Sequence, residues 1–318
     1  MSRRLAGKAG WHRAEAPPRR AFAERDTRCL QSCQDEPPGM NRVALFAHFD
    51  AQNEIKPYVG FLLERLRSSC SRIVFVTTSR PTEIELGKVR PVVDEVLVND
   101  NVGFDFGMWQ HALEREKLAA CDELVLTNSS SFGPIFPLGP IFERMTAGPS
   151  DFWGMTDSIE HRWHLQSYFL VLKRPAISSD AFRAFWESVL PYREKSQTIF
   201  SYELGLSQFL VEHGLRPAAF APLEAWATPA IRKRMSRRRQ WNPTLFYPSR
   251  LLEIGMPFVK VHLLRDNVGD VNLRPVRRRM GEAGYDERLI QFDAEPTARP
   301  KSYFRRLAEL AFHLGAST

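Results

Sequence analysis

The chain has 318 residues, of which 43% are hydrophobic and 25% are charged, and its formal net charge at pH 7 is +7. This length is enough for one large α/β domain or two small ones, and the composition is typical of a soluble globular protein. No run approaches the roughly 18 consecutive apolar residues that a membrane-spanning helix requires. The Arg-rich start lacks the apolar core of a secretory signal, so we expect a cytoplasmic protein.

Composition divides the chain into three parts. Residues 1–40 hold many arginines and two pairs of prolines without apolar periodicity, which predicts a disordered basic extension. Residues 41–270 carry the apolar pattern of one α/β domain. Residues 271–318 form a basic C-terminal segment, in which residues 302–314 place apolar side chains on one helical face.

Short apolar runs alternate with helical patterns in the first half of the domain. The apolar residues between positions 55 and 66 recur at helical spacing, and Asn53 is the expected N-cap of that helix. A parallel, Rossmann-like sheet is the usual result of such an alternation. The GxGxxG fingerprint is missing, which argues against a dinucleotide-binding domain. The four expected strands are residues 43–48, 73–78, 96–98 and 123–126.

The second half of the domain has more proline and glycine and longer polar connections. We expect helices at 141–145, at 181–190 and from 202 to Gly214, strands at 151–156 and 166–172, and a late strand within 257–264. The predicted fold class is therefore α/β, with a mainly parallel central sheet in a single domain.

Two of the predicted strands, at 96–98 and 123–126, end in clusters of small polar residues. In an open α/β sheet, the carboxyl ends of parallel strands lie at one edge, where ligands bind. If these two strands are neighbours, their polar loops enclose a crevice. Its expected lining is Asn99, Asp100, Asn101, Gly103 and Asp105 from the first loop and residues 128–133 from the second.

The first of these loops has the features of a nucleotide-binding segment. Gly103 and Gly107 allow close approach of the backbone, and the Asp105 carboxylate can accept hydrogen bonds from a ribose hydroxyl or a base. Alternatively, Asp105 is the N-cap of the following helix, where a carboxylate is also favourable. The other residues expected at the nucleotide are Asn101, His48, Asp50 and Thr77.

The segment Thr127–Ser131 carries hydroxyls and an amide but no carboxylate. Asn128, Ser129 and Ser130 can bind a sugar or a phosphate, yet such groups are poor primary ligands for Mg²⁺ or Mn²⁺. We therefore expect a metal-independent site and assign no cofactor. The alternative is a Ser-rich turn without a functional role.

A dense polar group precedes the strand predicted at 166–172. Histidine and arginine can compensate the charge of a diphosphate leaving group. His164 and Gln166 are the better candidates, because alternate positions on a strand face the same side. His161 and Arg162 are equally well explained as loop surface. The whole group is His161, Arg162, His164, Gln166 and Ser167.

Glu203 lies near the start of an apolar helix. A general base that deprotonates a hydroxyl must be a carboxylate or a histidine, which makes Glu203 the leading candidate, although acids are common at helix starts. Lys260, His262 and Arg265 in the late strand can hold phosphates, while a solvated Lys260 is the alternative.

The excess positive charge is concentrated at residues 232–239 and 277–279. Nucleic acid, anionic lipid headgroups or a phosphorylated small molecule would each match such runs, and a solvated basic loop is the alternative. Neither a recognition helix nor an RNP motif accompanies them, so we expect no nucleic-acid partner.

Several short motifs occur together, and in order, along residues 40–270. They are Asn101-x-Gly103-x-Asp105, Asn128-Ser129 with residues 133–138, residues 164–169, residues 202–207, and residues 242–244 with 255–260. This set resembles the rhamnan synthesis protein F family, which is found in bacterial cell-surface polysaccharide loci.

The resemblance implies a glycosyltransferase with a GT-A-like fold in rhamnan, O-antigen-like or lipopolysaccharide synthesis. It would transfer rhamnose or a related sugar from a nucleotide sugar, with dTDP-rhamnose the first donor to test and GDP-rhamnose the second, to a saccharide or a lipid-linked saccharide. The GT-A pattern places the base on Glu203, before a helix that ends at Gly214. The acid that binds metal in the family falls within 127–131, where this chain has Ser129, so a divalent metal is disfavoured.

We expect an inverting transfer, in which Glu203 takes the acceptor proton and the basic runs contact the inner-membrane surface or a lipid-diphosphate acceptor.

Two other functions remain open. One is a catalytically inactive sugar-nucleotide-binding or assembly subunit, with Ser129 a sign of lost catalysis. The other is a nucleic-acid-binding protein that uses residues 231–239. The transferase requires one cleft shared by Asp105, Asn128, His164 and Glu203.

Overall fold

The computed structural model describes residues 40–100 and 102–292. Three predictions fall outside these residues: the basic extension except for its last residue, the contact of Asn101 with a nucleotide, and the helix at 302–314. None of the helices in the described segments is long and apolar enough to cross a lipid bilayer.

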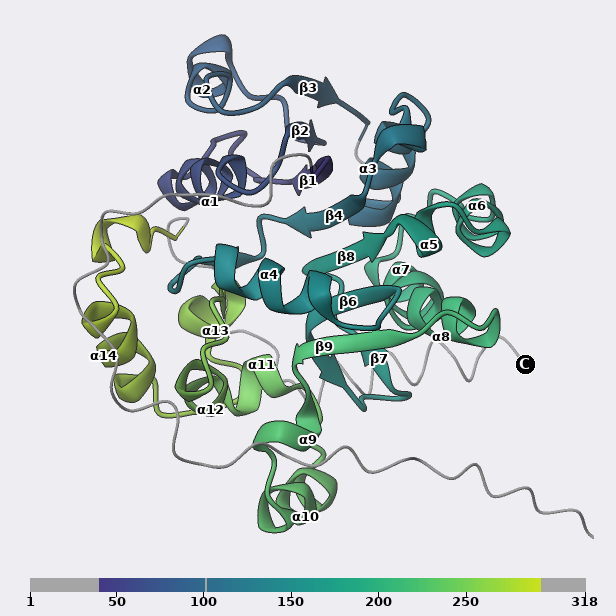
Figure 1. Cartoon of the computed structure of the whole chain (residues 1–318). Helices are drawn as coiled ribbons and strands as arrows, with labels where there is room; N and C mark the ends of the chain where they lie inside the picture. The colour runs from purple at the N-terminus through teal and green to yellow at the C-terminus, as the bar shows by residue number, and fades with distance from the viewer. Residues whose placement is uncertain (1–39, 101, 293–318) are drawn as a thin grey trace, which may run out of the picture. The chain divides into compact units, whose positions relative to one another are not determined.

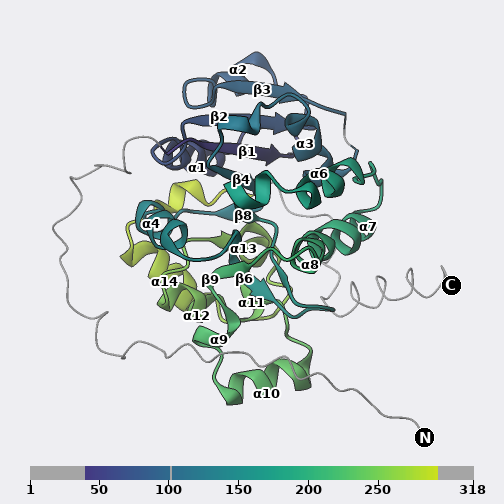
Figure 2. The same cartoon turned by 45° about the vertical axis from the view of Figure 1, so that its right-hand side comes forward.

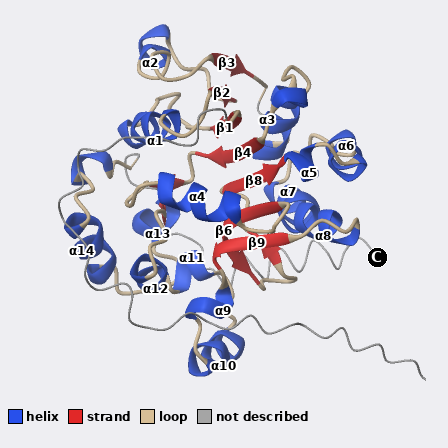
Figure 3. Ribbon diagram, viewed as in Figure 1, coloured by secondary structure: helices blue, strands red, loops and turns tan. Residues whose placement is uncertain are grey.

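A central sheet runs through the described part of the chain in the strand order β3-β2-β1-β4-β8-β6-β7, and β9 pairs with β6 (Figures 1 and 3). Strands β1 to β4 are mutually parallel, β8 lies antiparallel between β4 and β6, and β9 is parallel to β6. The strands are β1 (Arg42–His48), β2 (Arg72–Thr77), β3 (Glu95–Val98), β4 (Glu123–Asn128), β6 (Phe152–Ser158), β7 (His164–Leu165), β8 (Phe169–Lys173) and β9 (Pro217–Ala221). The predicted α/β class with a mainly parallel sheet is confirmed.

Helices cover both faces of this sheet, and each face has its own apolar core. On one face lie α3 (Phe104–Leu113), α5 (Arg174–Ile177), α6 (Asp180–Glu187), α7 (Lys195–Thr198), the π-turn η2 (Ile199–Glu203) and α8 (Leu204–Glu212). Figures 1 and 2 show α3, α6, α7 and α8 on one side of the strands in both views.

The other core contains α1 (Pro57–Arg67), α4 (Gly139–Ala147) and most of the chain after β9. The remaining elements are α2 (Glu83–Gly87), η1 (Leu118–Ala120), α9 (Leu223–Trp226), α10 (Pro229–Arg238), α11 (Pro243–Phe246), α12 (Pro248–Glu253), α13 (Val261–Asp266), α14 (Arg274–Glu282), η3 (Glu287–Leu289) and a separate two-stranded sheet of β5 (Ser131–Phe132) and β10 (Val259–Lys260).

The predicted start of the first helix is wrong, and the condition set for a crevice between the third and fourth strands, that they are neighbours, is not met. Lys56, not Asn53, is the N-cap of α1, and Pro57 begins the helix without a capping side chain. Strands β3 and β4 are not neighbours, because β2 and β1 lie between them.

Two predicted strands are shorter than expected. The strand at 166–172 begins only at Phe169. The late strand is two residues long, because it pairs only with β5 and the chain then turns into α13.

A buried ion pair joins the first strand to the fourth at the amino edge of the sheet. The Arg42 guanidinium donates two hydrogen bonds to Glu123 Oε2, at 2.8 and 2.6 Å, and both side chains are 2% exposed. Arg42 also donates to the carbonyl of Ser69 and lies over the Phe142 ring, while Thr146 donates to Glu123. All these partners compensate charges that would be costly to bury alone.

We expect the Arg42→Met variant to lose about 3–5 kcal/mol of unfolding free energy in urea, because an uncompensated Glu123 carboxylate remains buried. Adding Glu123→Gln should recover part of that loss. The matched control is Arg90→Met, at an exposed pair with Glu83, which should change stability by about 1 kcal/mol at most. Equal losses at the two arginines would contradict the assignment.

Candidate functional site

An open cleft of about 760 Å³ lies at the carboxyl edge of the parallel strands. Loops after β1, β2 and β4 contribute to it, together with the first turn of α3, the turn η2, and the segment from β10 into α13. Among its lining residues are Phe49, Thr78, Phe104, Asp105, Asn128, Ser129, Ser130, Gln166, Ser167, Glu194, Thr198, Glu203, Asn242, Thr244, Lys260, His262 and Arg265.

Many of the residues chosen from the sequence line this one cleft, although they come from five separate stretches of the chain. They are Asp105, Asn128, Ser129, Ser130, Gln166, Ser167, Glu203, Lys260, His262 and Arg265. Other residues named from the sequence do not line it, and these are His48, Asp50, Thr77, Asn99, Asp100, Gly103, Ser131, Phe132, Gly133, His161, Arg162 and His164. Three of the four residues required to share a cleft therefore do so, and the roles given to them stay predictions.

A chain of hydrogen bonds crosses the floor of the cleft. Asn128 Nδ2 donates to Asp105 Oδ2 at 2.8 Å, and Asn128 Oδ1 accepts from the backbone N–H and the hydroxyl of Ser130, at 3.1 and 2.5 Å. Lys260 Nζ donates to the Ser130 hydroxyl at 3.0 Å. A carboxylate only accepts hydrogen bonds and an ammonium only donates them. The two end groups therefore fix which atom donates in each hydrogen bond between them.

The start of α3 sets the position of Asp105. Gly103 (φ 76°) and Phe104 (φ 52°) are both left-handed, and they turn the chain sharply into the helix. A Cβ at Gly107 would lie 2.7 Å from the Val102 carbonyl, so this close turn needs glycine there. Gly103 is the N-cap, so the alternative in which Asp105 caps the helix is excluded. Its carboxylate lies in the first turn, near the positive end of the helix dipole.

The C-terminal segment supplies a cationic wall. Pairing of β10 with β5 puts Lys260 opposite Ser131, and Val261 N–H donates to the Ser130 carbonyl at 3.0 Å. The Lys260 ammonium also lies 4.1 Å from the centre of the buried Tyr168 ring. In the next turn, Asp266 holds two further lining residues: His262 Nε2 lies 2.9 Å from its carboxylate, and Arg265 donates to both its oxygens.

Glu203 closes the π-turn η2 and lines the cleft half-buried. Its Oε1 accepts a long hydrogen bond, 3.4 Å, from the Ser167 backbone N–H. Beside it, Gln166 accepts from Thr156 at 2.8 Å and donates to Asn242 Oδ1 at 3.3 Å. The amide of Gln166 is thereby held between the sheet and the start of α11.

His48, Thr77 and His164 do not line the cleft, and their side chains make local contacts instead. The His48 and Thr77 side chains are buried, and His48 Nδ1 is hydrogen bonded to the Thr77 hydroxyl at 3.0 Å. His164 is 4% exposed, and its Nδ1 donates to the Arg162 carbonyl at 2.9 Å. Burial lowers the pKa of His48 to about 4.

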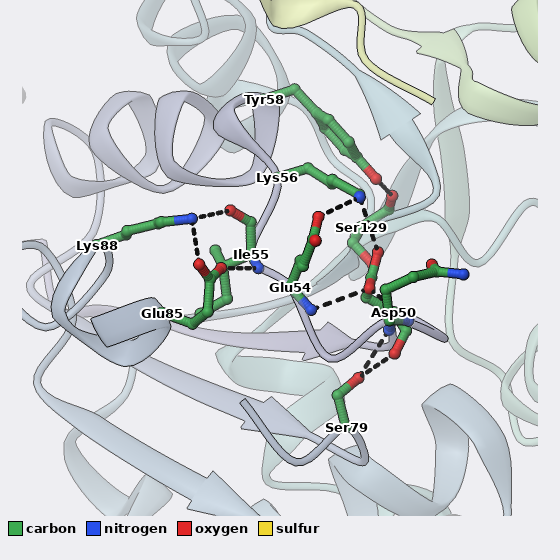
Figure 4. A network of polar contacts seen from close by, with 10 residues as sticks. Asp50, Glu54, Ile55, Lys56, Tyr58, Ser79, Glu85, Lys88 and Ser129 are labelled. Atoms are coloured by element: carbon green, nitrogen blue, oxygen red, sulfur yellow. Dashed lines mark hydrogen bonds and ion pairs between the residues drawn. The ribbon is translucent and has the colours of Figure 1, made fainter. Parts of the chain in front are cut away.

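Asp50 organises the loop between β1 and α1 (Figure 4). Its carboxylate accepts the backbone N–H groups of Gln52 and Glu54, at 2.9 and 3.0 Å, and its own N–H donates to the Ser79 hydroxyl at 2.7 Å. A neighbouring contact supports the cleft directly: the Tyr58 hydroxyl donates to the Ser129 carbonyl at 2.9 Å. Asp50 therefore has a role in loop structure and does not line the cleft, and its contact with a nucleotide stays a prediction.

Sequence reasoning did not select several residues that line the cleft. Phe49 and Thr78 belong to the loops after β1 and β2 that were expected at the nucleotide, but neither was assigned a role there. Asn242 and Thr244 belonged to a noted motif without an assigned role. Thr198 had no signal, because no motif includes it.

The donor atoms around Asn128 do not fit a divalent cation. They are one carboxylate, an amide, hydroxyls and the Lys260 ammonium, whose positive charge would repel a metal ion. Within residues 40–100 and 102–292, no three His, Cys, Asp or Glu side chains are grouped so that they could share one.

The family model of rhamnan synthesis protein F (RgpF) matches residues 73–309, about three quarters of the chain. The chain belongs to the RgpF family. The match begins at β2 and extends beyond Lys260 and α14, so it contains most of the cleft.

Two curated proteins are similar to part of this RgpF-family chain. Virulence protein VirA of Vibrio anguillarum is 27% identical over 197 residues, covering 55% of this chain and 63% of VirA. The uncharacterized protein y4gN of Sinorhizobium fredii is 25% identical over 153 residues, covering 46% of this chain and 40% of y4gN. The chain thus spans less than two thirds of the length of these relatives.

Solved structures resemble the chain only weakly. The mannosyltransferase PcManGT from Pyrobaculum calidifontis, in complex with GDP-Man and Mn²⁺, gives a TM-score of 0.40 at 14% identity, over 89% of this chain and 78% of that one. A putative nucleotide-diphospho-sugar transferase from Desulfovibrio desulfuricans G20 gives 0.33 at 12% identity, over 57% and 80%. Scores of this size carry no inference about activity.

The lowered pKa of His48 predicts a loss of stability in acid. The unfolded chain has the ordinary value of 6.5 and the folded chain about 4, so protons bind the unfolded state preferentially between these pH values. From pH 7 to pH 5, wild type should lose about 2 kcal/mol more unfolding free energy than His48→Gln. Urea titrations of both proteins at each pH measure this difference, and parallel pH profiles would contradict it.

Proposed function

We propose that this RgpF-family chain is a glycosyltransferase of cell-surface polysaccharide synthesis with a GT-A-like site. It transfers rhamnose or a related sugar from a nucleotide sugar, dTDP-rhamnose or GDP-rhamnose, to a saccharide or lipid-linked acceptor with inversion. The observation that carries the proposal is the meeting, in one cleft, of the Glu203 carboxylate with the Lys260 ammonium and the Asp105–Asn128 pair.

In this proposal the cationic wall receives the donor diphosphate. Lys260 is held in place by the Ser130 hydroxyl and the Tyr168 ring, so little side-chain freedom is lost on binding. His262 and Arg265 extend the wall along α13. A fixed cation beside the leaving group stabilises the charge that develops during transfer.

Glu203 is the proposed general base. Its carboxylate takes the proton of the acceptor hydroxyl, the hydroxyl oxygen forms a bond to the anomeric carbon, and the bond from that carbon to the diphosphate oxygen breaks. The nucleoside diphosphate leaves with the bonding pair, and its negative charge is neutralised by Lys260, His262 and Arg265. Asp105 and Asn128 offer acceptor and donor atoms to donor hydroxyls.

Charge on the surface supports contact with an anionic membrane. Helix α10 carries Arg232, Lys233, Arg234, Arg237 and Arg238, all exposed, and forms no ion pair within the described segments. In α14, by contrast, Arg278 and Arg279 are paired with Glu282. We therefore assign the membrane contact to α10, and cosedimentation with phosphatidylglycerol vesicles, weakening with salt, tests it.

A catalytically inactive sugar-nucleotide-binding subunit is the second candidate. It is favoured by Ser129, which stands where the family pattern has a carboxylate. Release of free nucleoside diphosphate from the donor separates the two functions, because binding alone releases none.

A third function, nucleic-acid binding through α10, makes a different prediction. The affinity for nucleic acid would persist after Asp105→Ala and would fall steeply as the salt concentration rises.

We expect Glu203→Gln to bind the donor as wild type does and to lower the transfer rate by roughly 10²–10⁴-fold, since an amide cannot accept the acceptor proton. Donor affinity from calorimetry and product formation by mass spectrometry measure the two effects. The control is Glu212→Gln, at the exposed end of α8, which should retain full activity. Transfer at the wild-type rate by Glu203→Gln would remove this residue from the mechanism.

Lys260→Met should weaken binding of the nucleoside diphosphate about tenfold or more, because a charge-assisted hydrogen bond to phosphate is lost. The corresponding nucleoside, which has no phosphate, should bind both proteins equally. Wild-type transfer should also continue in EDTA. Equal diphosphate affinities of wild type and Lys260→Met would contradict the assignment of Lys260 to the diphosphate. Loss of transfer in EDTA would contradict the metal-independent site.

A further inference from the structure

One end of the cleft contains a π-turn directly before Glu203. In η2, the N–H of Leu204 bonds to the carbonyl of Ile199, a spacing one residue wider than in an α-helix. Single π-turns are uncommon within helices and occur frequently at functional sites. The wider turn lets Thr198 and Glu203, five residues apart, both line the same cleft.

The Thr198 hydroxyl has no hydrogen-bond partner in the described part of the chain. Thr198 is 4% exposed, its Oγ1 is completely covered, and the residue borders the cleft. Buried hydroxyls are normally hydrogen bonded, so an orphan at a cleft wall indicates a partner supplied by a ligand. Glu203, which is the proposed base, lies one π-turn further along.

The start of α3 completes this end of the cleft. Gly103 N–H donates to the Tyr192 carbonyl at 3.0 Å, which ties the turn before α3 to the segment that leads into α7. Phe104 follows with its left-handed backbone and borders the cleft, as does Glu194. The end thus combines an aromatic ring, a hydroxyl and two carboxylates.

We infer that this end, formed by Phe104, Glu194, Thr198 and Glu203, is the subsite for a neutral saccharide acceptor. The inference rests on the proposed function and adds the place and chemistry of the acceptor. Rotation about χ1 turns Thr198 Oγ1 toward the cleft, where it hydrogen bonds to a sugar hydroxyl adjacent to the one that Glu203 deprotonates. The Phe104 ring packs against the C–H face of the sugar. The carboxylates disfavour phosphate here, whereas Lys260 and Arg265 favour it on β10 and α13.

The test measures binding of methyl α-L-rhamnopyranoside, methyl α-D-mannopyranoside and methyl β-D-glucopyranoside by saturation-transfer NMR. Wild type should bind at least one glycoside, Thr198→Ser should retain it, and Thr198→Val should weaken it at least about fivefold, because only the hydroxyl is removed. Thermal shifts with UDP, dTDP and GDP should be equal in all three proteins. If Thr198→Val does not fold, Thr198→Ala is measured by the same criterion.

Absence of glycoside binding to wild type, or equal binding to Thr198→Val, overturns the acceptor subsite. Altered nucleotide binding in Thr198→Val also overturns it, since the hydroxyl would then belong to the donor site. The two proposals fail separately. Thr198-dependent glycoside binding without any transfer by wild type would support the subsite and refute the transferase, and transfer unaffected by Thr198→Val would do the reverse.

Discussion

The hydrogen-bond chain from Asp105 to Lys260 is the constraint on which the cleft depends, because it joins three segments that are far apart in the sequence. The carboxylate comes from the first turn of α3, the amide and hydroxyl from the loop after β4, and the ammonium from the short strand β10. Removal of one member therefore takes a hydrogen-bond partner from its partly buried neighbours. The Tyr58 hydroxyl restrains the same loop from α1.

This arrangement also places positive charge where the Thr127–Ser131 segment lacks a carboxylate. A divalent cation needs acidic oxygens around it, whereas an ammonium needs only an acceptor and an apolar or aromatic support. Ser130 and Tyr168 give Lys260 these two contacts. In the proposed transferase, a lysine fixed in this way neutralises the donor diphosphate without a metal ion.

The strands β1, β2 and β4 could be predicted from sequence, since each contains the continuous apolar run that is typical of a buried parallel strand. The shorter run of β3 could also be recognised, although this strand lies at the edge of the sheet and only Leu97 in it is buried. The order of the four strands could not be predicted. Strands β3 and β4 carry the two polar loops, yet β2 and β1 separate them, and Asp105 reaches Asn128 only because α3 crosses back over β1. The residues around β10 were equally hard to place, as β5, a two-residue partner, decides where Lys260 lies.

What the sequence by itself determined is the class of the fold, the edge of the sheet at which polar residues gather, and the chemical character of that edge. These follow from apolar periodicity and from the residue types at strand ends. Only the tertiary structure decided which side chains face the cleft. After β1 and β2, the loop residues Phe49 and Thr78 line it while His48 and Thr77, the last residues of the strands, are buried, because packing against distant segments decides which residues stay open and composition carries no record of that packing.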